Sequence, residues 1–443
     1  FASSPLVGSG IPGANRFSVA SFSPLTGYYG EAEAGGWWSP ELKKAGYDAI
    51  LVEGRAEKPV FLWINDEAVQ IRDATHIWGK VTGDTQEIIR NETGESRARV
   101  ASIGPGGENM VRYACVVNNL RHTNGRSGMG AVMGSKNLKA IAVRGKQKIA
   151  FKNNAALKKI IKWYNDNFMD HPIERVLHDG GTIGWDVTEL DEAGILPTRN
   201  FHSGSFEDAN KICGETFHDK YFVKADSCHG CPIRCKRVAR STGAYQVDQT
   251  YGGPEYETAA AFGSLCGISD LEAICKAHEL CNSYTLDTIS AGSSIAFAME
   301  CFENNLLSIQ DTDGLELKFG NHEAMIRLIH KIAKREGIGD LLAEGTLRAA
   351  KKIGQGAEKF AMQVKGQEMA MHEPRGKGSL ALAYALSSTG ANHTEGPHDY
   401  LFQEGALGVS DLTELGLMEP TPAVYLGPEK ARQFAYMQKT WNV

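Results

Sequence analysis

The chain has 443 residues, of which 42% are hydrophobic and 23% charged. This composition is typical of a globular protein, excludes extensive disorder, and gives enough length for two or three domains with their own cores. The formal charge of -6 leaves no basic excess to neutralise phosphates. We therefore expect no nucleic-acid or membrane partner, and a small substrate or soluble partner instead.

The ends of the sequence bear on compartment and completeness. No run of about eighteen apolar residues occurs, and no charged-then-apolar leader opens the chain. A cytoplasmic protein is the expectation. Because the chain begins at Phe1 rather than Met and closes abruptly at Val443, we also expect it to be a piece of a longer protein.

Residues 1 to 150 are expected to form a mainly β domain. Short apolar runs bounded by turn residues predict strands at residues 16–22, 47–54, 59–64, 98–104 and 138–145. Two long glycine-rich stretches, residues 23–36 and 118–137, are predicted to be loops. Loops of that length in a compact domain are usually functional.

Beyond residue 150 the pattern changes to helical periodicity. Helices are predicted over residues 154–168, 269–284, 287–305, 322–337 and 340–354. Ser269 with Glu272 forms a candidate capping box, and Asp340 is a candidate N-cap. The fold class predicted from these patterns is α+β, a β-rich amino-terminal part followed by a predominantly helical remainder.

Three of the nine cysteines, Cys228, Cys231 and Cys235, lie within eight residues at the spacing C-x2-C-x3-C. Closely spaced thiolates on a loop can converge on one inorganic centre, so an iron-sulfur cluster is the leading interpretation. Zinc is the main alternative, although a second close pair of Cys or His normally follows in zinc sites. Simple buried thiols are the remaining interpretation.

A cubane cluster needs a fourth ligand. Five further cysteines lie on segments that are equally compatible with apolar core, namely Cys213, Cys266, Cys275, Cys281 and Cys301. From the residues alone, the fourth ligand stays open between these cysteines and one beyond Val443.

Several motifs together resemble the aldehyde ferredoxin oxidoreductase family. They are SPLTGYYGEAEAGG, SPELKKAGYDAILVEG, IGPGGEN, NNLRHTNGRSGMGAVMGSKNLKAIAV, CHGCPIRC, GGPEYETAAAFGSLCGI, ELCNSYTLDTISAG and HEPRGKGSLALAYALSSTGANHT. The resemblance implies a tungsten or molybdenum bis-pyranopterin cofactor beside a [4Fe-4S] cluster, with magnesium as an optional addition. It also implies a pterin-binding base domain over residues 1–150, a helical domain with the cysteine loop over 151–365, and the start of a second helical domain over 366–443.

By that resemblance, the glycine loops carry the pterin contacts. A pterin needs exposed backbone N–H groups, approachable glycines and arginines for its phosphates. The residues at the family's positions are Arg16, Gly35, Gly36, Arg121, Thr123, Gly125, Arg126 and Asp287. The motif that ends at Asp287 departs from the family pattern, with Asn282 in place of Asp and Thr285 in place of Gly.

The resemblance also places an acid–base pair. Glu257 is favoured over Glu255 as the catalytic carboxylate, and His393 is the expected proton donor or carbonyl partner. From the residues alone, both also fit structural roles, Glu257 at a helix start and His393 as a core histidine. His372, His398, Glu395 and Arg375 are weaker candidates for the same pocket.

The function implied by the resemblance is oxidation of an aldehyde to a carboxylic acid, or the reverse. Electrons would pass through the cluster to ferredoxin or an iron-sulfur subunit, in a homo- or hetero-oligomer. Two alternatives stay open. One is a related tungsten enzyme that reduces aromatic thioesters, and the other is a non-catalytic iron-sulfur or zinc module.

Overall fold

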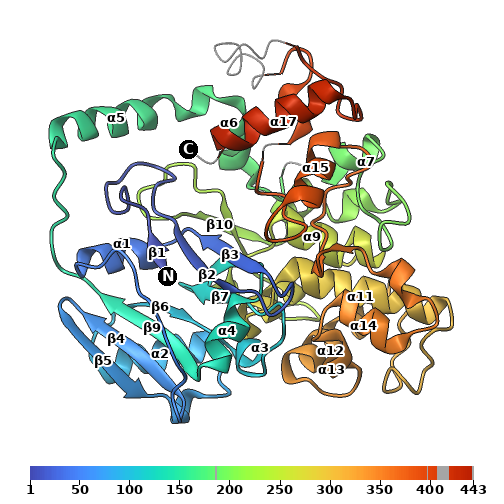
Figure 1. The fold of residues 1–443 in the computed structure, drawn as a ribbon, viewed down its shortest axis with the longest axis horizontal. Coiled ribbons are helices and arrows are strands. Elements are labelled where there is room, and N and C mark those ends of the chain that lie inside the picture. Colours follow the sequence, from blue (N-terminus) through green and yellow to red (C-terminus); the bar gives the residue numbers. More distant parts are fainter. Residues whose placement is uncertain (185–186, 397, 407–418, 442–443) are drawn as a thin grey trace.

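The computed structural model describes residues 1–184, 187–396, 398–406 and 419–441. Within these residues, the amino-terminal part holds a six-stranded sheet in the order β5-β4-β9-β6-β7-β8 and a three-stranded sheet in the order β1-β2-β3 (Figure 1). All neighbouring strands are antiparallel except β4 and β9. The strands are β1 (Ala2–Ser3), β2 (Phe17–Phe22), β3 (Tyr29–Ala34), β4 (Val60–Asn65), β5 (Ala68–Asp73), β6 (Arg99–Ser102), β7 (Val116–Asn118), β8 (His122–Asn124) and β9 (Leu138–Arg144).

The inner strands of the six-stranded sheet are buried on both faces, whereas the edge strand β5 is largely exposed. Along β9, Ile141 and Val143 join a core shared with the small sheet and with helices α1 (Trp38–Lys44) and α4 (Met129–Ser135). Ala140 and Ala142 point to the opposite face, into a core beneath α2 (Thr82–Thr93). Because side chains alternate along a strand, two covered faces require a continuous apolar run, which β9 has.

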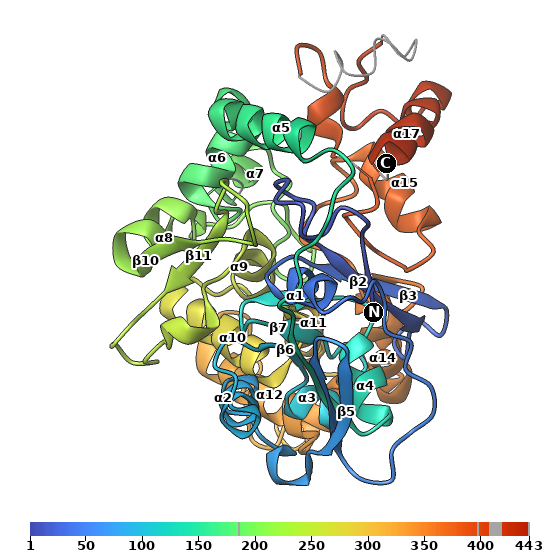
Figure 2. The same ribbon diagram turned by 90° about the vertical axis from the view of Figure 1, so that its left-hand side faces the viewer.

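The remainder of the chain is mainly helical and shares one large core (Figure 2). Its elements are α5 (Asn154–Asn167), α6 (Pro172–Gly180), α7 (Val187–Glu192), α8 (Gly214–Lys220), α9 (Tyr256–Phe262), α10 (Leu271–Tyr284), α11 (Thr288–Glu303), α12 (His322–Lys334), α13 (Ile338–Leu342), α14 (Thr346–Ile353), α15 (Gly378–Leu386) and α17 (Pro428–Trp441). Two strands, β10 (Phe222–Asp226) and β11 (Lys236–Ala239), form an antiparallel hairpin among them. The predicted α+β class is confirmed.

Four of the five predicted strands are present as β2, β4, β6 and β9. The prediction for residues 47–54 is wrong, since this segment makes a single bridge, from Ala49 to Ala2, and is otherwise irregular. Its apolar side chains cover the sheet edge without joining a ladder. The two stretches predicted as loops also hold regular structure, because β3 lies in the first and β7, β8 and α4 lie in the second.

The two predicted helix starts, at Ser269 and Asp340, are wrong. The N-cap of α10 is Asp270, whose carboxylate accepts from Ala273 N at 2.9 Å, so the Ser269 capping box is wrong. Asp340 lies inside α13 and pairs with Arg335 at 2.8 Å instead of capping. The single helix predicted over residues 340–354 is two, α13 and α14, because Gly345 with φ +82° separates them.

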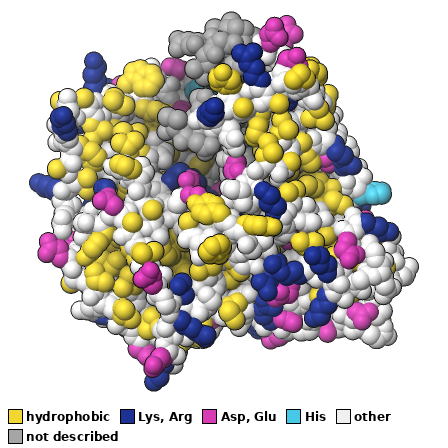
Figure 3. All heavy atoms as spheres, viewed as in Figure 1, with side chains coloured by type: hydrophobic (Ala, Val, Ile, Leu, Met, Phe, Trp, Pro, Cys, Tyr) yellow, Lys and Arg dark blue, Asp and Glu magenta, His cyan; other side chains and the backbone are white. Residues whose placement is uncertain are grey.

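Among the described helices, none is both long enough and apolar enough to cross a membrane. The space-filling view shows a hollow near the centre of one face, with acidic and basic side chains beside it (Figure 3). The β-rich part and the helical core around α9, α10 and α11 lie side by side in both ribbon views.

Candidate cofactor and active site

The three clustered cysteines lie on the loop that closes the β10–β11 hairpin. Asp226 pairs with Lys236 in the last rung of the ladder, so the hairpin holds both ends of the loop together. Inside the loop Cys231 N donates to Cys228 O at 3.2 Å, and Gly230 adopts φ +69°. A left-handed turn of this kind lets side chains on both sides of it converge, which a regular strand would not allow.

The amino-terminal domain supplies the seat for this loop. His229 N donates to Gly36 O at 3.1 Å, Asn15 Nδ2 donates to His229 O at 2.8 Å, and Trp37 Nε1 donates to Ser227 O at 3.1 Å. A Cβ on Gly35 would lie 2.5 Å from Cys228 Sγ. Gly35 and Gly36 therefore lie against the cysteine loop, not among the residues that line the cavity described below.

The sulfur spacing separates a cluster from zinc. In the described residues, one group of three Cys, His, Asp or Glu side chains has its ligand atoms within 4.8 Å of one another, and it is Glu257, His372 and His393. Sulfurs around a tetrahedral zinc would lie about 3.8 Å apart, given Zn–S bonds of about 2.3 Å. The three loop thiols are more widely spread, which suits a multinuclear cluster better than one zinc ion.

The other cysteines of the helical part are core residues. Cys213, Cys266, Cys275, Cys281 and Cys301 belong to the large hydrophobic core and are buried. Burial raises the pKa of Cys266 and Cys275, which stabilises their neutral thiol forms. These thiols pack as small apolar side chains.

A cavity of about 490 Å³ lies between the β-rich part and the helical part. The β-rich side contributes Arg16, Arg121, Thr123 and Gly125, four of the residues expected to contact pterin. Arg16 pairs with Glu33 at 2.9 Å, and Arg121 pairs with Asp226 at the start of the cysteine loop. Arg121 thus lies between the cavity and the loop.

The helical side of the cavity contributes a carboxylate and histidines. Glu257, in the first turn of α9, accepts from Met371 N at 2.8 Å through Oε2. Its Oε1 lies 3.1 Å from His372 Nε2 and 3.5 Å from His393 Nε2, but makes no hydrogen bond of good geometry. Both imidazoles therefore face one carboxylate oxygen that accepts no hydrogen bond.

Lys377 determines the tautomer of His372. Its ammonium, which carries only donors, lies 3.1 Å from His372 Nδ1. Nδ1 is therefore the acceptor, and the proton of the neutral ring lies on Nε2, toward Glu257. Burial, with Lys377 and His393 nearby, lowers the pKa of His372 well below its usual value.

His393 and His398 complete the histidine group. The ring centroid of His372 lies 5.3 Å from that of His393 and 4.3 Å from that of His398. Burial lowers the pKa of His393, and Nδ1 of both His393 and His398 is buried without a hydrogen-bond partner. Unpartnered buried nitrogens are costly unless a ligand pairs with them.

Glu255 has a different set of partners from Glu257. Its carboxylate pairs with Lys236 Nζ at 2.7 Å and accepts from Thr182 Oγ1. The pKa of Glu255 is lowered, because the Lys236 ammonium and these hydrogen bonds outweigh burial, which by itself acts in the opposite direction. The geometry thus favours Glu257 as the carboxylate free to act on a ligand.

Arg126 and Asp287 connect the amino-terminal part of the chain to the helical part. Arg126 donates to Ala391 O at 2.6 Å and to Glu368 O, and its Nε lies 3.4 Å from Asp287 Oδ2. Asp287 lines the cavity and caps α11, accepting from Ile289 N and Ser290 N. Arg126 thereby connects the second glycine-rich stretch to the segments that hold His372 and His393.

The departures from the expected motif have local explanations. Asn282 donates to Tyr251 O at 2.9 Å and to His278 Nε2 at 3.0 Å, bonds that an Asp carboxylate would not make. Thr285 stands at φ +63°, where Gly is the unstrained choice. Its hydroxyl accepts from Gly104 N at 2.9 Å, which stabilises this conformation.

Some candidates lie elsewhere, and other residues were missed. Arg375 pairs with Glu373, and Glu395 accepts from Thr389 Oγ1, so neither lines the cavity. Lys236 and His278 do line it. Lys236 was detectable, because it directly follows Cys235, whereas His278 lies on the apolar face of a helix and gave no signal.

The donor set fits a pterin cofactor with an adjacent cluster. Two arginines and one glycine of the β-rich part line the cavity together with Asp287 and four histidines of the helical part, and several buried polar atoms there have no partner in the described residues. The cysteine loop adjoins the cavity through Lys236 and Arg121. The fold and site together define a protein with a polar cavity between a β base and a helical cover.

Comparison with known proteins identifies the family. The profile "Aldehyde ferredoxin oxidoreductase, N-terminal domain" matches residues 1–145, and "Aldehyde ferredoxin oxidoreductase, domains 2 & 3" matches residues 159–443. The chain belongs to the aldehyde ferredoxin oxidoreductase family, as its motifs predicted.

Individual relatives at different levels of sequence identity support the same family. The tungsten-containing aldehyde ferredoxin oxidoreductase of Pyrococcus horikoshii is 42% identical over 415 residues, covering 92% of this chain and 66% of that protein. An aliphatic sulfonate oxidoreductase, WOR-like subunit, of Pyrococcus furiosus is 32% identical, covering 80% and 59%. The solved active-site complex BamBC of benzoyl coenzyme A reductase with 1,5-dienoyl-CoA has a TM-score of 0.76 at 32% identity, covering 89% and 61%. The chain spans about two thirds of the length of these curated relatives.

Proposed function

We propose that this chain is part of a tungsten or molybdenum pterin oxidoreductase that interconverts aldehydes and carboxylic acids. The observation that carries the proposal is the group Glu257, His372 and His393, whose ligand atoms lie within 4.8 Å of one another in a cavity beside a cysteine loop. A carboxylate and neutral imidazoles in a shielded cavity are suited to proton transfer near pH 7.

Glu257 is proposed to accept the proton when water is activated. Its Oε2 is fixed by Met371 N, and its Oε1 is free to take a proton from a ligand. His372 holds its own proton toward that oxygen, because Lys377 occupies its Nδ1. At 3.1 Å between His372 Nε2 and Glu257 Oε1, this proton would stabilise the charged carboxylate electrostatically while leaving Oε1 without a hydrogen bond.

His393 is proposed to contact the substrate carbonyl. Its burial keeps the ring neutral, so one nitrogen donates while the other accepts. Nε2 faces Glu257, and Nδ1 has no partner among the described residues. A carbonyl or carboxyl oxygen of the substrate would satisfy this histidine.

When bound, a pterin-held metal would supply the two-electron redox chemistry, and an iron-sulfur cluster would pass the electrons on singly. Arg16, Arg121, Thr123, Gly125 and Asp287 would hold the pterin, and Cys228, Cys231 and Cys235 would hold the cluster. Ferredoxin or an iron-sulfur subunit is the proposed electron partner, by analogy with the names of the relatives. Magnesium remains an optional addition.

The test is the composition and turnover of the full-length protein purified without oxygen. Tungsten or molybdenum with two pterins and about four irons per chain would support the proposal, and aldehyde-dependent dye reduction would complete it. Zinc without pterin would contradict it and favour a structural cysteine site.

A second function, reduction of an aromatic thioester, is favoured by the likeness to the BamBC complex. The same cofactor content is expected in both cases, so only turnover separates them. Reduction of benzoyl-CoA with a low-potential dye, without aldehyde oxidation, would replace the first proposal. The identity of 42% to an aldehyde enzyme makes the first the stronger candidate.

A further inference from the structure

A second polar cavity, of about 410 Å³, opens on the other side of the cysteine loop. We call it the arginine pocket and define it by Trp37, Gln86, Arg90, Arg99, Arg121 and Lys224, all of which line it. Four cations face this pocket and Asp226 is the acidic residue on its wall, already paired with Arg121. The pocket therefore has a net positive charge although the chain is acidic overall.

Three of the four basic groups have free donors, whereas the Arg121 guanidinium is already bonded to Thr250 O, Asp226 and Gln249 O. Arg90 Nε donates to Ala98 O at 3.0 Å, which orients the guanidinium, and its two terminal nitrogens have no hydrogen-bond partner among the described residues. Arg99 lies over the Trp37 ring, with 5.1 Å from its Cζ to the ring centroid. The Arg99 and Lys224 side chains donate no hydrogen bond to any described residue.

The two arginines also repel each other. Burial and the neighbouring Arg99 lower the pKa of Arg90. Among acidic residues, Glu41 is the one that raises the pKa of Arg99. Its carboxylate is already bonded to Arg144 and to Gly145 N. Two guanidinium groups held close together without a shared anion are electrostatically unfavourable, and a bound anion would relieve this repulsion.

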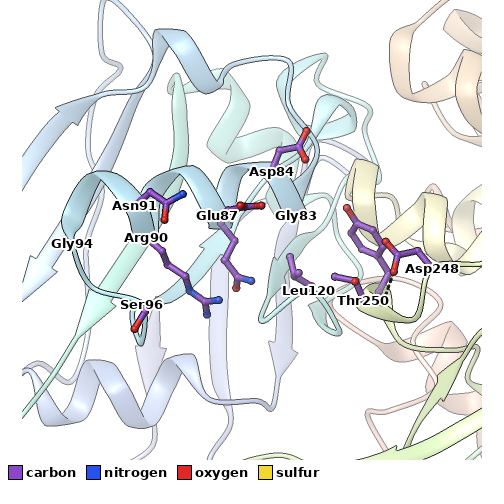
Figure 4. Close-up of a pocket in the computed structure, with 12 residues that line it drawn as sticks. Gly83, Asp84, Glu87, Arg90, Asn91, Gly94, Ser96, Leu120, Asp248 and Thr250 are labelled. Atoms are coloured by element: carbon purple, nitrogen blue, oxygen red, sulfur yellow. Dashed lines mark hydrogen bonds between the residues drawn. The ribbon is translucent and has the colours of Figure 1, made fainter.

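Gln86 adds a buried amide side chain to the wall of the arginine pocket. It is only 9% exposed, lines the pocket, and its Oε1 is buried without a hydrogen-bond partner. It precedes Arg90 by one helical turn on α2, so both side chains leave the same face. Figure 4 shows Arg90 extending from α2 into the adjoining hollow, whose opposite side carries Leu120 and Thr250.

A phosphate group fits these features. Its anionic oxygens accept from Arg90 and Arg99 in the bidentate manner that guanidinium favours. An amide presents either its NH₂ or its oxygen, so Gln86 can pair with a phosphate oxygen or with a hydroxyl of the ligand. The volume, about 410 Å³, is in the range of pockets that hold small organic molecules and exceeds the need of a free phosphate ion.

We propose that the arginine pocket binds the phosphate group of a small phosphorylated metabolite. This site is separate from the cavity of Glu257, although Arg121 lines both. The proposal does not depend on the redox reaction of the proposed function.

The test is titration of the full-length protein with inorganic phosphate, AMP and glucose 6-phosphate, followed by calorimetry. We expect an organic phosphate to bind more tightly than inorganic phosphate. Arg99→Gln and Arg90→Gln should each weaken binding by about tenfold or more, because each removes a charge-assisted contact. Lys224→Gln, an exposed substitution, should weaken it less.

Arg72→Gln is the matched control. Arg72 also lies over a tryptophan, with 6.0 Å from its Cζ to the Trp63 ring centroid, but it does not line the arginine pocket. This variant should bind phosphates like the parent protein. Melting temperature and iron content, measured on every variant, separate loss of binding from loss of folding.

Three results would overturn the proposal. One is no binding of any of the three phosphates up to about 10 mM. Another is binding that is equal in the parent, Arg90→Gln and Arg99→Gln proteins. The third is binding of an acidic protein, such as a ferredoxin, that depends on Arg99 while the small phosphates do not bind, which would make the pocket a protein-docking site.

Discussion

Cys228, Cys231 and Cys235 lie on one hairpin loop, whereas Glu257, His372 and His393 come from three segments far apart in the chain. A hairpin and one glycine turn bring its thiols into one loop, which the amino-terminal domain then holds through Asn15, Gly36 and Trp37. The second group forms only when α9, residues 369–376 and residues 387–396 pack together. The first arrangement is therefore local, and the second depends on the whole core.

The largest effect is expected at the local site. Cys231→Ser should lower the iron content of the full-length protein from about four per chain to near zero, because a thiolate ligand of the proposed cluster is lost. Iron and sulfide analysis would measure this. Cys275→Ala, a substitution in the helical core, should keep its iron. Unchanged iron in Cys231→Ser would remove this loop from the cluster.

The next largest effect is expected in the group of Glu257, His372 and His393. Glu257→Gln should lower kcat by about 10² to 10⁴, the usual range for loss of a general base, with little change in melting temperature. Glu255→Gln is the matched variant, and it should mainly lower stability, by about 1 kcal/mol, because Lys236 loses its partner. Steady-state kinetics and thermal unfolding of both proteins would measure these effects. The reverse pattern would assign the catalytic role to Glu255.

A smaller effect is expected where the two parts of the assembled site are joined. Arg126→Lys keeps the charge but cannot bond both Ala391 O and Glu368 O, which should cost about 1.5 to 3 kcal/mol. Faster hydrogen exchange is expected in residues 367–372 and 388–396, measured by mass spectrometry. Unchanged exchange there would show that Arg126 does not hold the histidine segments.

The last effect is a pH dependence from the cavity wall. Burial, together with Lys236, lowers the pKa of His278 to about 4. The unfolded chain binds this proton near pH 6.5 and the folded chain does not, so stability should fall as pH drops from about 6.5 to 4, by at most about 1.4 kcal/mol per unit. His278→Asn should show a shallower decline in melting temperature over this range. An equal slope in both proteins would assign the pH dependence to other groups.

Much of the fold was predictable, because segments with a strong periodic pattern of apolar residues keep the same secondary structure in the folded protein. The runs at β4, β6 and β9 and the helical patterns at α10, α11 and α12 all appear with nearly the predicted limits. The errors have tertiary causes. Residues 47–54 have the composition of a strand but find one bridge at the sheet edge, and Asp270 outcompetes Ser269 as the cap of α10.

The sequence by itself determined the cysteine loop, the α+β class and the family, because these depend on short spacings and ordered motifs. Only the tertiary structure gave Glu255 and Glu257 their different partners, directed the His372 proton through Lys377, and placed Gly35 and Gly36 beside Cys228. It also brought Gln86, Arg90, Arg99 and Lys224 into one pocket. The sequence does not reveal such groups, because the members of a pocket and the position of a histidine proton depend on residues that are distant along the chain. These residues come close only after folding.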